Sequence, residues 1–122
     1  MDLDAARALV SGTWQASILP ALERYIAIPA KSPAFDGEWQ RNGHLDGVVA
    51  LAAEWVEAQH IDELRLDVVR LPGRTPVLLL EAPGDVGETV LLYGHLDKQP
   101  EMSGWAAGLG PWTPVRRGDR LY

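Results

Sequence analysis

Two residues whose side chains commonly take part in metal chemistry, His95 and Asp97, follow an apolar run of the chain. In an extended backbone, residues two apart project to the same side, so the imidazole and the carboxylate can reach the same point. A histidine nitrogen is a common metal ligand, and a nearby carboxylate can fix its tautomer and raise its basicity. The spacing therefore allows His95 to be a metal ligand that Asp97 orients, but a His-x-Asp sequence also occurs often by chance. The alternative is a histidine at a strand end beside a solvated aspartate.

A catalytic zinc site needs about three protein ligands and an open position for water. The other histidines, His44 and His60, fall at the start and just past the end of a predicted helix, without a histidine or carboxylate at ligand spacing. We therefore expect both to be surface residues. The chain has no cysteine, which excludes a thiolate zinc site and a cysteine nucleophile. The motif residues of this chain cannot complete a metal site.

Three residues after the His-Leu-Asp sequence could have either a functional or a structural role. Lys98 could face an anionic group of a substrate, or it could be an ordinary solvated lysine. Trp105 and Trp112 could wall a substrate cleft, or they could anchor a long loop to the rest of the fold.

The composition excludes several classes of protein. The chain carries 17 acidic and 11 basic residues and a net charge of −6, which argues against a nucleic-acid partner. No apolar run approaches the length of a membrane span. The N-terminal residues are acidic where a signal peptide would be basic. We therefore expect a soluble, cytoplasmic protein without a membrane partner.

Two segments with a helical period must support the candidate site. Apolar residues recur every three or four positions over residues 4–27 and 43–59, which predicts two amphipathic helices. Pro20 lies inside the first segment and is expected to kink it or divide it. The second helix is apolar over a wide arc, so we expect it to lie against a sheet.

After the second helix the period of the apolar residues changes to two. Residues 64–71 alternate as in a half-buried strand, whereas residues 76–82 and 89–93 are continuous apolar runs typical of strands covered on both faces. The tail, residues 114–122, is typical of a strand, a turn and a second strand. This order predicts an α/β layer fold with two or three helices packed on a mixed sheet.

The predicted strand at 89–93 explains where the candidate site would lie. Open α/β sheets bind their ligands beyond the carboxyl ends of strands, and His95 follows such an end. The chain stops on two apolar residues, Leu121 and Tyr122, in a strand that has only begun. We therefore expect the domain to be incomplete at its C-terminus.

Several ordered motifs together resemble one enzyme family over essentially the whole chain. The central motif is Gly94–Pro100, and the motifs after it, at family spacing, are Gly104-Trp105, Gly110–Pro114 and Arg117–Tyr122. The motifs before it are Ile28-Pro29, Lys31–Pro33, Phe35-Asp36, Trp39 and Gly73–Pro76. The chain is similar to the carnosinase-like metallodipeptidases, which belong to the clan of aminoacylase-like and carboxypeptidase-like zinc peptidases.

The resemblance implies a function and a role for each motif residue. His95 would be a metal ligand, and Asp97 would be a catalytic-site residue that orients the metal centre. The complete enzyme would hydrolyse dipeptides or small peptides with a metal-activated water at two divalent ions, with zinc as the expected metal, and would be a homodimer.

The resemblance also implies that residues 1–122 are the N-terminal portion of the catalytic domain, without the lid and dimerisation domain. The bridging aspartate, the glutamate that acts as general base and the remaining ligands would all follow Tyr122. The alternative function is an inactive truncated fragment or a non-enzymatic binding piece of the same fold.

Overall fold

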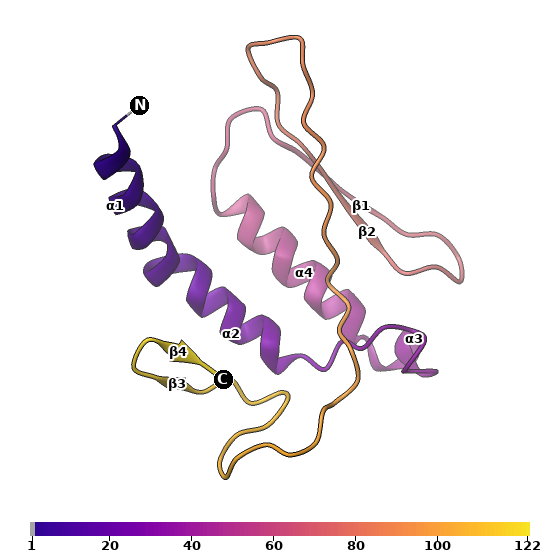
Figure 1. The fold of residues 1–122 in the computed structure, drawn as a ribbon. Helices are drawn as coiled ribbons and strands as arrows, with labels where there is room; N and C mark the ends of the chain where they lie inside the picture. Colours follow the sequence, from indigo (N-terminus) through magenta and orange to yellow (C-terminus); the bar gives the residue numbers. More distant parts are fainter. Residues whose placement is uncertain (1) are drawn as a thin grey trace. The chain divides into compact units, whose positions relative to one another are not determined.

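A computed structural model describes residues 2–122. The chain divides into two compact units. One unit contains the residues up to Pro29 together with Glu101–Tyr122, and the other contains Ala30–Pro100. Figure 1 labels the helices and strands of the two units.

The first unit begins with a long helical segment. It consists of α1 (Leu3–Thr13), a π-helical turn η1 (Trp14–Ile18) and α2 (Leu19–Ala27). The carboxylate of Asp2 accepts hydrogen bonds from the backbone N–H groups of Asp4 and Ala5, at 3.0 and 3.1 Å, and so caps the start of α1.

The helical segment is divided close to the position that the sequence indicated. Pro20 lies in the first turn of α2, where a missing N–H is tolerated, and the π-helical turn immediately precedes it. At this junction the N–H of Leu19 bonds to the carbonyl oxygen of Trp14, five residues earlier. The helix therefore continues past the proline through a wider turn.

The C-terminal residues of this unit form a small hairpin. Strands β3 (Arg116–Arg117) and β4 (Arg120–Leu121) pair antiparallel, with Gly118 and Asp119 in the turn (Figure 1). This confirms the predicted strand, turn and strand, and it places the Arg-Gly-Asp sequence at a hairpin turn. The guanidinium of Arg116 bonds to the carboxylate of Glu23 on α2 and ties the hairpin to that helix.

The second unit contains α3 (Trp39–Asn42), α4 (His44–Glu57), β1 (Arg65–Val69) and β2 (Val77–Glu81). The strands form an antiparallel hairpin in which Arg65 is opposite Glu81 and Val69 is opposite Val77. Helix α4 packs against β2, as its wide apolar face predicted (Figure 1). The buried apolar residues of this unit are Ala30, Leu45, Val48, Val49 and Leu51.

Two predictions for the sheet are wrong. Residues 89–93 form no strand in the described chain, and residues 76–82 are not covered on both faces, because Val77, Leu79 and Leu80 are about half exposed. An apolar run becomes a buried strand only when neighbouring strands and a covering layer are available. The two sheets found in residues 2–122 each have two antiparallel strands, so the fold is a combination of helices and small sheets and not one mixed sheet.

No helix within residues 2–122 has both the length and the apolar character that a membrane crossing requires.

Candidate functional site

The side chains of His95 and Asp97 contact each other. The Nδ1 atom of His95 lies 3.0 Å from the carboxylate Oδ1 of Asp97 and 3.0 Å from its backbone carbonyl oxygen. Both oxygens are acceptors, so the contact favours the tautomer that carries its proton on Nδ1. In that tautomer Nε2 has a free lone pair and can bind a metal ion.

The two side chains differ in their exposure to solvent. The side chain of His95 is 64% exposed, and that of Asp97 is 33% exposed. The imidazole is therefore accessible to an incoming ion, while the carboxylate that orients it is more sheltered. A hydrogen bond from one ring nitrogen to a carboxylate is also the usual support of metal-ligating histidines.

Backbone pairing fixes the chain immediately after Asp97. The N–H of Lys98 donates to the carbonyl oxygen of Ala30 at 2.8 Å, and the N–H of Ser32 donates to the carbonyl oxygen of Lys98 at 2.9 Å. Lys31 and Lys98 thereby form a parallel bridge, and Ala30 is completely buried. The loop before α3 and the His-Leu-Asp sequence, which the resemblance had linked only as motifs, lie side by side.

Sequence reasoning missed this pairing for a physical reason. An isolated bridge uses backbone groups only, and its residues Lys31 and Lys98 have no side-chain pattern that marks a strand. The proline-rich composition around residues 29–37 predicts a loop, which is correct, but it does not indicate which segment the loop pairs with.

Partial burial of Lys98 lowers the pKa of its ammonium group to about 8, because desolvation disfavours the charged form. The amine is therefore more often neutral near the candidate site than an ordinary solvated lysine would be at mildly alkaline pH. The lowered pKa shows that Lys98 is not an ordinary solvated lysine. It does not identify a substrate group that Lys98 would contact.

We expect the Lys98 amine to titrate with a midpoint near pH 8 in the folded chain. Unfolding returns the pKa of this group to its higher ordinary value, so the unfolded state binds more protons between the two values. The free energy of unfolding should therefore rise as the pH rises through this window. Nuclear magnetic resonance of the side chain measures the midpoint, with Lys98→Arg to assign the signal and Lys31 as the internal comparison. A midpoint near pH 10.5 would contradict the burial of this group.

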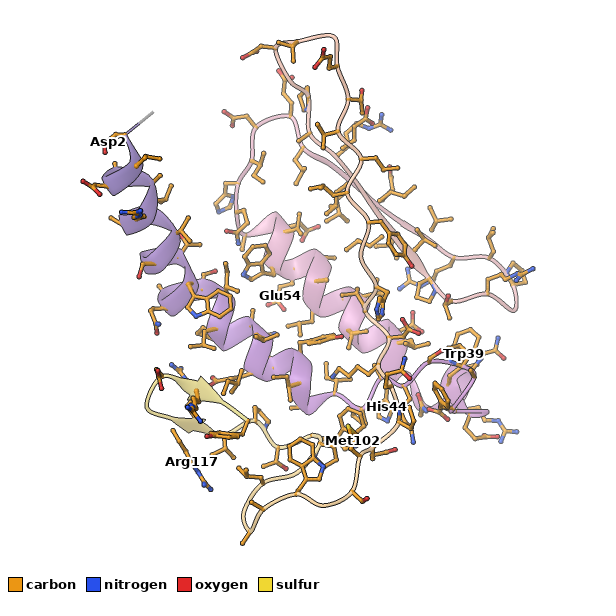
Figure 2. All side chains as sticks on the ribbon, in the orientation of Figure 1. Asp2, Trp39, His44, Glu54, Met102 and Arg117 are labelled. Carbon is orange, nitrogen blue, oxygen red and sulfur yellow. The ribbon has the colours of Figure 1, made fainter. Side chains whose placement is uncertain are left out.

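The other histidines do not join His95. His44 begins α4, where its backbone N–H donates to the side-chain oxygen of Asn42 at 3.0 Å (Figure 2), and His60 follows the end of that helix. In the part of the chain that the structure describes, no three His, Cys, Asp or Glu side chains are grouped so that they could hold a metal ion. The site residues amount to one imidazole and its orienting carboxylate.

The tryptophans favour the structural interpretation. The indole N–H of Trp105 donates to the carbonyl oxygen of Met102 at 2.7 Å, and that of Trp112 donates to the carboxylate of Glu101 at 3.3 Å. Both donors are used within the loop itself. These bonds stabilise the loop conformation, and they belong to the first unit, whereas His95 belongs to the second.

Comparison with known proteins adds no family assignment. No protein-family model matches the chain, and no curated protein matches it.

Proposed function

We propose that residues 1–122 form the N-terminal part of a metal-dependent dipeptidase, in which His95 is a metal ligand and Asp97 holds its imidazole. The contact between Nδ1 of His95 and the Asp97 carboxylate, at 3.0 Å, is the observation that carries the proposal. It leaves Nε2 of an exposed histidine available to an ion, next to a carboxylate that increases its basicity. The resemblance of the ordered motifs supplies the reaction class.

The donor chemistry of this pair fits zinc, which binds imidazole nitrogen readily. The number of donors does not suffice, because a catalytic zinc takes about three protein ligands and residues 2–122 contain no such group. The proposal therefore requires the bridging aspartate, the other ligands and the general base to come from chain beyond Tyr122. A bound metal would lower the pKa of a water molecule and polarise the peptide carbonyl.

The residues of this chain have separate tasks in the proposed reaction. Asp97 accepts a hydrogen bond from the Nδ1–H of His95 and keeps the ring in the metal-binding tautomer. The bridge between Lys31 and Lys98 holds the backbone immediately after Asp97, so the carboxylate has a fixed support. We propose a cytoplasmic homodimer as the complete enzyme, with dipeptides or small peptides as substrates.

The proposal is tested by expressing the complete reading frame that contains these residues and measuring zinc-dependent hydrolysis of a panel of dipeptides. Hydrolysis that stops when a chelator is added and returns with zinc supports it. A reading frame without further ligands, or a complete protein that binds zinc but cleaves no dipeptide, favours the alternative of an inactive fragment or a binding piece.

The chain of residues 1–122 by itself is expected to bind zinc weakly and to have no peptidase activity. One imidazole ligand gives little affinity, because metal affinity grows with the number of ligands that converge on one point. Calorimetric titration with zinc measures the affinity, and a dipeptide assay at saturating zinc measures the activity. Tight binding with hydrolysis would show that the active site lies elsewhere in these residues.

A further inference from the structure

The sequence contains a single asparagine, Asn42, and the residue that follows it is a glycine, Gly43. Asn42 is the last residue of α3, and Gly43 joins that short helix to α4 (Figure 1). Asparagine is one of the thermolabile residues of proteins, because the next backbone nitrogen can attack its side-chain amide. A glycine at the next position has no side chain that would obstruct this attack.

The backbone nitrogen that would attack is not engaged elsewhere. Within residues 2–122 the N–H of Gly43 donates no hydrogen bond, either to a backbone carbonyl or to a side chain. Its φ of 71° lies in the left-handed region, which glycine occupies without strain, so the chain can leave α3 and enter α4 at this single residue. No existing hydrogen bond has to break before this nitrogen reacts.

The side-chain amide of Asn42 is held at both ends. Its oxygen accepts a hydrogen bond from the backbone N–H of His44 at 3.0 Å, and its nitrogen donates to the carboxylate of Asp36 at 2.6 Å. A backbone N–H that points at a carbonyl oxygen stabilises the negative charge that develops there during nucleophilic attack. The half-buried Asp36 fixes the amide in this orientation, since its other oxygen accepts the N–H of Glu38 at 3.0 Å.

We infer that Asn42 is a site of spontaneous deamidation in the folded protein. The backbone nitrogen of Gly43 forms a bond to Cγ of Asn42 and gives up its proton, and the side-chain nitrogen takes up a proton and leaves as ammonia. Water then opens the cyclic imide, with its hydroxyl going to a ring carbonyl carbon and its proton to the ring nitrogen. The product is aspartate or isoaspartate, depending on which C–N bond breaks, and water is the only co-reactant.

The modification reverses the interaction with Asp36. In the product a carboxylate replaces the amide that donates to Asp36 at 2.6 Å, and two carboxylates so close together repel each other. Aspartate still accepts the N–H of His44, because aspartate and asparagine cap helix starts equally well. Asp36 lies in the same loop as Lys31, which forms the bridge with Lys98. Deamidation should therefore loosen this loop beside the candidate site and leave α4 intact, which goes beyond the proposed function and requires no metal.

Peptide mapping by mass spectrometry tests the reaction. The folded protein and the protein unfolded in guanidinium chloride are incubated in the same mildly alkaline buffer with a chelator. Asn42 should gain the mass that replacement of NH₂ by OH adds, at least as fast in the folded protein as in the unfolded one. Asn42→Gln is the matched control, because its longer side chain must close a larger ring, and it should keep its mass. Slower conversion of Asn42 in the folded protein, or none, would overturn the inference.

Hydrogen exchange tests the consequence for the loop. Asn42→Asp reproduces the aspartate product, and the backbone amides of Ser32 and Glu38 should exchange several-fold faster in it than in the unchanged protein. The amide of His44 should stay protected. Adding Asp36→Asn to this variant again pairs one amide with one carboxylate, so it should restore the slow exchange. Equal exchange in the three proteins would show that the contact does not hold the loop, and it would overturn the consequence even if Asn42 deamidates.

Discussion

His95→Ala in the complete enzyme is expected to reduce zinc-dependent dipeptide hydrolysis to background while the fold is retained. The substitution removes the ligand atom Nε2 that the proposal assigns to the metal, and no other histidine of residues 2–122 lies close enough to replace it. The side chain of His95 is mostly exposed, so its removal leaves no large cavity and should cost little stability. The measurements are metal content by elemental analysis, turnover of a dipeptide, and thermal unfolding.

A matched histidine variant separates loss of the ligand from loss of any histidine. His60 lies past the end of α4 with a positive φ of 50°. His60→Asn is the suitable control, because asparagine tolerates this backbone conformation better than alanine does. It should keep the metal and the activity of the unchanged enzyme. If His95→Ala also keeps both, His95 is a surface histidine beside an aspartate, and the metal assignment is wrong.

The part of the fold that depends on local pattern could be predicted from the sequence. The helical period of α4, the alternation of β1 and the Pro-Gly turn between β1 and β2 each lie within a short stretch, so local sequence determines them. The prediction of a strand at 89–93 was wrong because strand formation depends on more than local sequence. Its residue types favour a strand, but a strand also needs a neighbour, and in residues 2–122 Thr89–Tyr93 have none.

The candidate site could likewise be predicted only where it depends on residues that are close in the sequence. The proximity of His95 and Asp97 follows from a spacing of two in the sequence, and the structure places their atoms 3.0 Å apart. The bridge of Lys98 to the chain around Lys31 could not be predicted, because it joins distant segments through backbone atoms alone. Likewise, no pattern in the chain indicates which ligands would join His95, since such ligands converge only in space.

Asp97→Asn in the complete enzyme is expected to lower the rate of dipeptide hydrolysis about 10- to 100-fold, a range typical of residues that orient metal ligands. The backbone carbonyl oxygen of Asp97 also lies 3.0 Å from Nδ1 of His95 and remains in the variant. An amide oxygen can accept the same hydrogen bond as the carboxylate. The ring should therefore keep its orientation, and the lost activity should reflect the missing negative charge. Zinc content should fall less than the rate.

The control for this variant is Asp85→Asn, which removes the same charge from an exposed turn after β2. It should leave both rate and metal content unchanged, so a general effect of net charge can be subtracted. Asp97→Ala provides the second comparison, since it removes the side-chain acceptor as well as the charge. It should lose more zinc than Asp97→Asn, because only the backbone carbonyl then holds the imidazole. If Asp97→Asn hydrolyses dipeptides at the unchanged rate, the carboxylate is a structural partner of His95, and the orienting charge must come from another residue.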